Sequence, residues 1–306
     1  MDRLRQSELP VLVDVEVLAS WQRGERGQDT ERPGFVPRDP APEDGALKIL
    51  DVRWTVFGSG DGHDEYLRGH IPGAVYVSMA SQLAGHDGPR EGRHPLPDPG
   101  RFGDTVRMLG INDGDTIVVY DDAQATSAAR AWWLLRHAGF EKTYLLDGGL
   151  TAWRNANLPL QPGDVIPVPG RARTTWGQMP VLDMDDAAAL PERGVLLDAR
   201  ACERYRGDSE PLDPQAGHIP GALSAPTAEN LDATGHFRPA DELEERFRKL
   251  GVDGAASVGV YCGSGVSAAH EVAALHLAGL DAALYPGSWS AWSNTPGRPV
   301  ATGDRP

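Results

Sequence analysis

The chain has 306 residues, of which 40% are hydrophobic and 24% charged, a composition typical of globular proteins and a length sufficient for two ordinary domains. Its 29 basic and 44 acidic residues give a formal net charge of −15, which argues against nucleic acid or an anionic membrane as a partner. Two cysteines are too few for a disulfide framework or a four-cysteine zinc site. No apolar run has signal-peptide or membrane-spanning length, so we expect a cytoplasmic protein.

The chain carries one ordered set of short motifs twice. An Asp-x-Arg motif stands at residues 51–53 and again at 198–200, and the sequence GHIPGA stands at 69–74 and again at 217–222. Because the matches keep their order and the repeat is far longer than a solenoid unit, each copy is predicted to be a whole domain. The predicted organisation is a first domain, a linker rich in proline and glycine, and a second domain: 1–154, 155–178 and 179–306.

Short β-branched runs alternate with helical patterns inside each copy. In the second copy, residues 195–197 and 258–261 are predicted strands, and 240–250 is a predicted amphipathic helix because apolar side chains recur at helical spacing. Strands that alternate with helices favour a parallel sheet covered on both faces. The predicted fold class is therefore α/β, with a mostly parallel sheet flanked by helices in each domain.

Cys262 stands between a predicted strand and a predicted helix, in a position that suits a reactive thiol. The strand at 258–261 ends directly before it, and the helix is predicted from 268 to 278. Parallel sheets bind their ligands at the carboxyl ends of their strands. Gly263 and Gly265 allow the loop to curl so that backbone N–H groups point inward, and the helix N-terminus adds positive potential. Such a loop stabilises a thiolate or a persulfide anion.

The alternative for either cysteine is a buried, inert thiol. The glycines and serines beside Cys262 argue against that interpretation, because inert cysteines usually have apolar neighbours. Cys202 lies in the sequence ACER and has no such glycines, so the inert interpretation is preferred for it.

The paired motifs, the single cysteine loop in the second copy and the GSW sequence at 287–289 together resemble the tandem-domain rhodanese family over nearly the whole chain. The resemblance implies two tandem rhodanese-like domains and a sulfurtransferase that uses thiosulfate or 3-mercaptopyruvate. It further implies that Cys262 takes sulfur from a small anionic donor as a persulfide and passes it to cyanide or a thiol, with no metal or organic cofactor. Asp121 stands where the first domain would carry its cysteine, so that domain is expected to be non-catalytic.

The same resemblance assigns the donor site. Arg204 matches the arginine that binds the substrate anion, and a guanidinium suits a carboxylate or sulfonate because it offers paired donors. Ser264 is either a hydrogen-bonding member of the loop or a catalytic aid to the substrate, and both roles stay open. The remaining loop residues are expected to contact the donor: Gly263, Gly265, Val266 and Ser267.

Two positions depart from the mercaptopyruvate branch of the family, so the preferred donor is not decided. Asp213 stands where a second carboxylate-binding arginine is expected, and Ala80 stands where an aspartate would orient a histidine. That histidine is His94, expected to assist the loop serine, and Trp54 is expected to line the pocket from the first domain or to be part of a core.

The duplicated charged and histidine motifs are expected to fix loops and not to react. They comprise Asp51, Arg53, His70, Asp198, Arg200 and His218.

Two other functional classes are considered. A cysteine phosphatase needs an arginine six positions after its cysteine, and this chain has Ala268 there, so a phosphatase is disfavoured. A persulfide carrier or regulatory module that turns over small donors poorly stays open, because Asp213 and Ala80 weaken the expected donor site.

Overall fold

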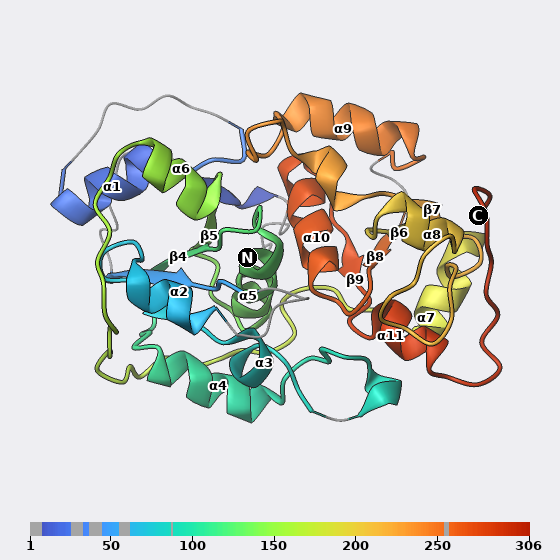
Figure 1. The fold of residues 1–306 in the computed structure, drawn as a ribbon, viewed down its shortest axis with the longest axis horizontal. Helices are drawn as coiled ribbons and strands as arrows, with labels where there is room; N and C mark the ends of the chain where they lie inside the picture. Colours follow the sequence, from blue (N-terminus) through green and yellow to red (C-terminus); the bar gives the residue numbers. More distant parts are fainter. Residues whose placement is uncertain (1–7, 26–32, 37–44, 55–61, 87, 254–256) are drawn as a thin grey trace, which may run out of the picture. The chain divides into compact units, whose positions relative to one another are not determined.

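A computed structural model describes the chain except for residues 1–7, 26–32, 37–44, 55–61, 87 and 254–256 (Figure 1). The chain divides into two compact units. The N-terminal unit comprises Leu9–Ala84 and Pro97–Gln178, and the C-terminal unit comprises Met179–Pro306 together with Gly85–Leu96. The predicted domain boundaries at 154 and 179 stay a prediction. The units differ from them at 85–96, which packs with the second repeat, and at 155–178, which packs with the first.

The N-terminal unit is built on a five-stranded parallel sheet with the strand order β1-β5-β4-β2-β3. Its strands are β1 (Leu12–Val13), β2 (Leu47–Asp51), β3 (Val75–Tyr76), β4 (Thr116–Tyr120) and β5 (Thr143–Leu146). Its helices are α1 (Val15–Arg23), α2 (His63–Arg68), α3 (Met79–Gln82), α4 (Pro99–Met108), α5 (Thr126–His137) and α6 (Gly149–Asn155).

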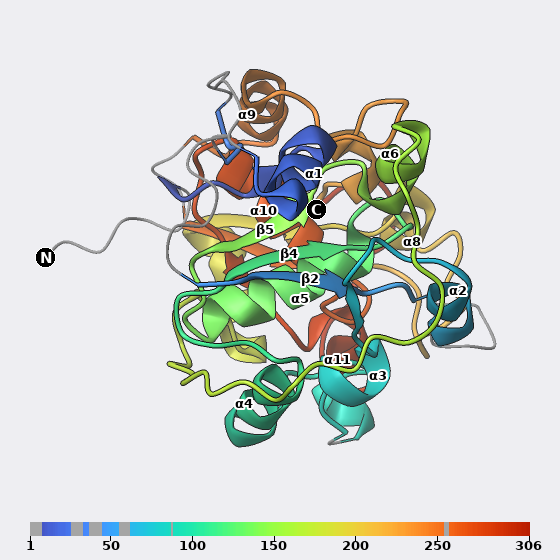
Figure 2. The same cartoon turned by 90° about the vertical axis from the view of Figure 1, so that its left-hand side faces the viewer.

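Both faces of this sheet are covered by helices. Side chains of α1 and α6, including Trp21 and Trp153, share a core with Val118 and Tyr120 of β4. The helix α5 packs against β4 and β5, and Figures 1 and 2 show it across the sheet from α1. Successive strand residues point to opposite faces of the sheet. Because helices cover both faces, all five residues of β4 are buried. A central strand of this kind reads as a continuous apolar run.

The C-terminal unit repeats the design with a four-stranded parallel sheet in the order β7-β6-β8-β9. Its strands are β6 (Gly194–Asp198), β7 (Leu223–Ser224), β8 (Ser257–Tyr261) and β9 (Ala283–Leu284). Its α-helices are α7 (Met184–Ala189), α8 (Cys202–Arg206), α9 (Ala240–Lys249), α10 (Ser267–Leu277) and α11 (Ser288–Ser293). The described part of this unit also contains the 3₁₀ turns η2 (Pro89–Glu91), η3 (Leu190–Glu192) and η4 (Thr227–Asn230).

The predicted α/β class with two parallel sheets is confirmed, as are the elements around Cys262. The predicted strands correspond to β6 and β8, and the predicted amphipathic helix is α9, whose Leu243 and Phe247 are buried. One face of the sheet packs on α7 and α11 through an apolar cluster that contains Trp289 and Trp292, while α10 packs against β8, β9 and α9. The core therefore fixes β8 and α10, the two elements that flank the cysteine loop.

The repeated motifs join strand ends to the following turns in the same way in both units. Arg53 donates from Nε and Nη2 to the carboxylate of Asp51, at 3.0 and 2.7 Å, and from Nη2 to the carbonyl of Gly69 at 3.0 Å. Arg200 makes the equivalent contacts with Asp198 and the carbonyl of Gly217. These are structural ion pairs, as expected from the sequence.

The histidines of the GHIPGA motifs contact backbone. Nδ1 of His70 lies 3.0 Å from the carbonyl oxygen of Tyr66, and Nδ1 of His218 lies 2.8 Å from that of Tyr205. Each ring also stacks on its tyrosine. The expected structural role of both histidines is confirmed.

None of the helices in the described ranges combines the length and apolar character that crossing a bilayer requires.

Candidate active site

Cys262 begins the loop that connects β8 with α10, at the carboxyl end of a central strand. The residue is 1% exposed, and the backbone N–H of Gly265 donates to Sγ at 3.1 Å. Gly265 has φ +78°, which a residue with a side chain rarely adopts. A Cβ at this position would also lie 2.5 Å from the carbonyl oxygen of Pro286. The sequence therefore needs glycine here to aim a donor at the sulfur.

The turn before α11 holds the cysteine loop through hydrogen bonds. The N–H of Cys262 donates to Oγ of Ser288 at 3.1 Å, and Ser288 Oγ donates to the carbonyl of Tyr285 at 2.9 Å. The N–H groups of Trp289 and Ser290 donate to the carbonyls of Cys262 and Gly263, both at 2.9 Å. In the sequence, GSW was one of the features that carry the family resemblance, and the structure gives it this supporting role.

Ser264 lies next to His94 in the folded unit. Ser264 as a whole is 8% exposed, and its Oγ is 2.8 Å from Nδ1 of His94, which belongs to the 85–96 segment. That segment is attached to the C-terminal unit, because the N–H of Arg93 donates to Oγ of Ser290 at 3.0 Å and η2 packs on α11. The structure thus brings together the serine and histidine that the sequence selected. Their catalytic roles stay a prediction.

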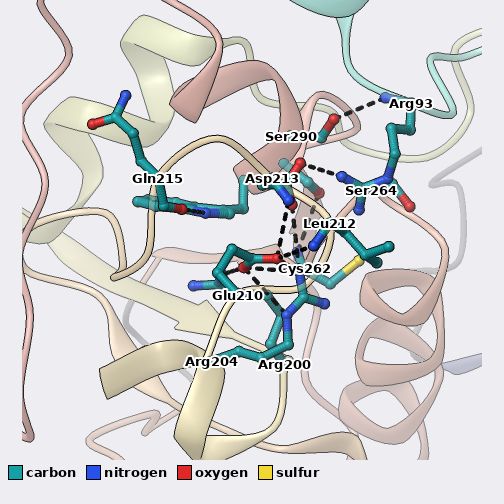
Figure 3. Close-up of polar contacts among 12 residues, drawn as sticks. Arg93, Arg200, Arg204, Glu210, Leu212, Asp213, Gln215, Cys262, Ser264 and Ser290 are labelled. Carbon is teal, nitrogen blue, oxygen red and sulfur yellow. Dashed lines mark hydrogen bonds and ion pairs between the residues drawn. The ribbon is translucent and has the colours of Figure 1, made fainter. Parts of the chain in front are cut away.

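Arg204 is held by two carboxylates that the sequence analysis did not place beside it (Figure 3). Its Nη2 donates to both carboxylate oxygens of Glu210, at 2.7 and 2.9 Å, and its Nε donates to the same group at 3.2 Å. The same Nη2 donates to Asp213 at 3.3 Å. Glu210 was missed because it stands in a polar stretch without periodicity or motif.

Arg93 is a second cation at this site. Its Nη1 donates to Oδ1 of Asp213, so this carboxylate bridges Arg93 and Arg204 (Figure 3). A Cβ built on Gly263 would lie 3.1 Å from Nη2 of Arg93 and 3.2 Å from Nη1 of Arg204. Both guanidinium groups therefore converge on the residue that follows Cys262. The only sequence signal for Arg93 was its position beside His94.

Asp213 is a buried carboxylate in a cluster of charges. Burial raises its pKa above the ordinary value of 3.8, and the nearby negative charge of Glu210 adds to this effect. The positive charges of Arg93 and Arg204 act in the opposite direction but do not cancel it. Asp213 would therefore be protonated at a higher pH than an ordinary aspartate. Its protonation would leave the positive charges of Arg93 and Arg204 less neutralised beside the cysteine loop.

The remaining predicted site residues have different positions. Val266 is buried at the N-cap of α10, and Ser267 is the first residue of that helix and half-buried. Trp54 follows β2 in the N-terminal unit and is half-buried, so its predicted role in the pocket stays a prediction. Cys202, which the sequence did not select for the site, begins α8 and is half-buried, with Oγ of Ser224 at 3.7 Å from its sulfur.

The equivalent loop of the N-terminal unit shows what such a loop can hold. Asp121 follows β4, and its carboxylate accepts from four backbone N–H groups at 2.8–2.9 Å and from Oγ of Ser127 at 3.0 Å. The N–H donors belong to Ala123, Ala125, Ser127 and Ala128. A buried carboxylate thus accepts backbone hydrogen bonds from the strand-to-helix turn that is equivalent to the Cys262 loop of the second repeat.

A cysteine at the carboxyl end of a central strand of a parallel sheet, with a backbone N–H donated to its sulfur, is the arrangement of a cysteine-dependent enzyme. The family model described as a rhodanese-like domain matches residues 39–156 and 183–295. The chain therefore belongs to the tandem-domain rhodanese family and is a sulfurtransferase.

Three similar proteins illustrate the relationship. The SseB protein of Mycobacterium tuberculosis, named as a thiosulfate sulfurtransferase, is 47% identical over 263 residues, covering 84% of this chain and 91% of that protein. A Pseudomonas aeruginosa protein named as a 3-mercaptopyruvate sulfurtransferase is 43% identical over 271 residues, covering 84% and 93%. The solved structure of SseA from Escherichia coli, titled as a 3-mercaptopyruvate sulfotransferase, has a TM-score of 0.76 and 33% identity, covering 92% of this chain and 99% of that chain.

Proposed function

We propose that the protein moves sulfur from thiosulfate or 3-mercaptopyruvate to cyanide or a thiol through a persulfide on Cys262. The observation that carries the proposal is the N–H of Gly265 aimed at a buried sulfur in a strand-to-helix loop. Relatives named for each of the two donors support the donor class. The backbone N–H groups that donate to the Asp121 carboxylate in the equivalent loop support a role of the loop amides in stabilising a charged sulfur.

The proposed reaction has two displacement steps. The Cys262 thiolate attacks the outer sulfur of the donor, so a new S–S bond forms. The bond from that sulfur to the rest of the donor breaks, and its electron pair leaves with sulfite or with the enolate of pyruvate. The acceptor then attacks the outer sulfur of the persulfide, and the S–S electron pair returns to Cys262 as a thiolate.

Ser264 and His94 would serve the step in which a carbonyl donor departs. The enolate of pyruvate needs a proton, and a hydroxyl 2.8 Å from an imidazole nitrogen can relay one. Sulfite needs no proton to leave.

The test is steady-state transfer from each donor on one preparation, together with the mass of the protein after incubation with donor alone. We expect turnover with at least one donor and one added sulfur atom on the peptide that contains Cys262, removable by cyanide. Turnover without the adduct would contradict the persulfide and favour direct transfer in a ternary complex.

A second candidate is a persulfide carrier that receives sulfur from a protein partner. The observation that favours it is the neutralisation of both arginines near the loop by the buried carboxylates of Glu210 and Asp213. A carrier would acquire the Cys262 persulfide from a protein persulfide and turn over small donors far more slowly. The same steady-state measurement separates the two functions.

A further inference from the structure

Four charged side chains form a cluster beside the cysteine loop, and they differ in exposure. The carboxylates of Asp213 and Glu210 are 1% and 3% exposed, whereas the side chains of Arg93 and Arg204 are 30% and 19% exposed. The cluster is neutral in total, but its arginines are the members that solvent and small molecules can reach. An anion that approaches the loop would therefore meet the cations first.

The two carboxylates do different work in this cluster. Glu210 is built into the backbone, because its Oε1 accepts from the N–H groups of Leu212 and Asp213, both at 3.1 Å, while its Oε2 also accepts from Arg200 at 3.3 Å. The carboxylate of Asp213 has hydrogen bonds to Arg93 and Arg204, and the described part of the chain offers it no others. Glu210 fixes Arg204, whereas Asp213 bridges the two arginines.

Each arginine keeps one terminal nitrogen on the side of the cysteine loop. Arg93 uses Nη1 for Asp213, and its Nη2 faces Gly263. Arg204 uses Nε and Nη2 for the carboxylates, and its Nη1 faces Gly263. Any side chain at position 263 would crowd both groups, since even a Cβ would lie 3.1–3.2 Å from them. Because Gly263 has no side chain, it leaves space for an anion to contact both guanidinium groups next to Cys262.

We propose that Arg93 is the second cation of the donor site, that Arg93 and Arg204 together bind the carboxylate or sulfonate of the donor beside Gly263, and that the negative charge of Asp213 behind them weakens this binding. Arg93, from the 85–96 segment, thereby supplies the second positive charge that an arginine at position 213 was expected to supply. The inference rests on the proposed function for the identity of the anion as a donor. The anion site itself rests on the cluster.

The experiment compares two reagents of similar shape, iodoacetate and neutral iodoacetamide, as alkylating agents of Cys262. In both reactions the thiolate displaces iodide from carbon, so the ratio of the two second-order rate constants cancels thiolate reactivity and reports the attraction of a carboxylate. The readout is intact mass and the alkylated peptide of the full chain. It requires no sulfur transfer.

We expect Arg93→Ala to lower the ratio of iodoacetate to iodoacetamide rates by about tenfold, the effect of losing one charge-assisted hydrogen bond. Asp213→Asn should raise the ratio by about three- to tenfold, because it removes a negative charge but keeps the shape. Arg206→Ala is the matched control. Arg206 lies on the same helix as Arg204 but pairs with the exposed Asp208, so its loss should leave the ratio unchanged.

A ratio for Arg93→Ala within twofold of the unmodified protein would overturn the assignment of Arg93. A ratio for Asp213→Asn that stays the same or falls would overturn the opposing role of Asp213. If Arg93→Ala does not fold, Arg93→Gln retains most of the side-chain volume without the charge and must show the same fall. If the unmodified protein transfers no sulfur but the alkylation ratios change as expected, the proposed function is wrong and the anion site stands. If the unmodified protein transfers sulfur but none of the variants changes the alkylation ratio, the anion site is wrong and the proposed function stands.

Discussion

At the scale of single residues, the two cysteines differ in what surrounds the sulfur. Cys262 receives an N–H donor from Gly265 in a tight loop, whereas the hydroxyl of Ser224 lies 3.7 Å from the Cys202 sulfur. An amide aimed at a sulfur favours the anion over the thiol. This contrast predicts which cysteine carries sulfur.

We expect Cys262→Ser to abolish transfer, to below about one thousandth of the original kcat, because a serine hydroxyl is a far weaker nucleophile at neutral pH. Cys202→Ser serves as the control and should retain nearly full activity. Both variants are measured with thiosulfate and 3-mercaptopyruvate as donors and cyanide as acceptor. Clear residual transfer by Cys262→Ser would refute the mechanism.

Ser264 is predicted to matter for one donor and not for the other. The departing enolate of pyruvate takes up a proton, whereas sulfite does not, so Ser264→Ala should lower kcat with 3-mercaptopyruvate by about 10- to 100-fold and leave thiosulfate turnover within about threefold. His94→Asn should act in the same way, and the double variant should lose no more than either single one, because both act through one hydrogen bond. Equal losses with both donors would assign Ser264 to loop structure instead.

Asp213 predicts a pH dependence for anion attraction. Because burial raises its pKa above 3.8, its charge is lost at a higher pH than that of an ordinary aspartate, and the arginines beside it keep theirs. The ratio of iodoacetate to iodoacetamide alkylation should therefore rise as the pH falls from neutrality toward about 4. Protonation of His94 would raise the ratio in the same direction.

The contribution of Asp213 is the part of this rise that Asp213→Asn abolishes, since that variant retains His94, Arg93, Arg204 and Glu210. Identical pH profiles for the unmodified protein and Asp213→Asn would contradict this contribution of Asp213.

The raised pKa of Asp213 also has a consequence for stability. The native state binds this proton more tightly than the unfolded chain, so the Asp213 contribution to the unfolding free energy declines as the pH rises above 3.8 through the native pKa.

At the scale of elements, the cysteine loop depends on the turn that precedes α11. Ser288, with φ 53°, lies in the left-handed region and offers its Oγ to the N–H of Cys262, while Trp289 and Ser290 bond the loop carbonyls. A non-glycine residue in this region costs about 1–3 kcal/mol unless its surroundings impose it. Here the buried Trp289 and the loop contacts do so.

Gly265→Ala tests the geometry of the loop. The added Cβ would meet the carbonyl of Pro286 at 2.5 Å, so we expect a loss of at least about 2 kcal/mol in unfolding free energy and of about 100-fold in kcat. Gly279→Ala is the matched control at the other end of α10. Gly279 also has φ +73°, but no atom lies within 4 Å of its Cβ position, so only the backbone cost of about 1 kcal/mol is expected, without loss of activity. Equal effects on kcat would contradict a local role of Gly265. Chemical denaturation and steady-state transfer provide the two measurements.

At the scale of the whole molecule, the unit that contains Cys262 is not continuous in the chain. The segment 85–96, which lies within the first repeat of the sequence, packs with the second. A Cβ on Gly92 would lie 2.7 Å from the carbonyl of Gly287, which shows how closely the segment approaches the turn before α11. Arg93 and His94 both reach the site from this segment.

The fragment 179–306 therefore lacks two site residues although it contains both cysteines. We expect it to fold but to show at least about tenfold lower kcat/KM for transfer than the full chain, since one charge-assisted hydrogen bond alone accounts for that factor. Circular dichroism and iodoacetamide alkylation of Cys262 verify the fold and the thiol. Full transfer activity of the folded fragment would show that 85–96 is dispensable for the chemistry.

Local patterns in the sequence were sufficient for the two repeats, the parallel α/β class, the strand that ends at Tyr261 and the cysteine loop. The physical reason is that buried strands, amphipathic helices and glycine-dependent turns are encoded by neighbouring residues, through period, propensity and the left-handed conformation. The loop itself extends over consecutive residues, so its composition was visible without any knowledge of the fold.

The tertiary structure alone decided which charges meet at the site. Arg93 and Asp213 are 120 residues apart, so no local pattern relates them. His94 and Ser264 are 170 residues apart, and only the family resemblance related them before the fold was known. Arg204 was selected from the sequence as an anion binder, but its ion pairs with Glu210 and Asp213 depend on how a polar loop returns to the sheet edge. Such loops follow no hydrophobic period. Their conformation is set by packing and by the pairing of buried charges. Both of these arise only once the chain has folded.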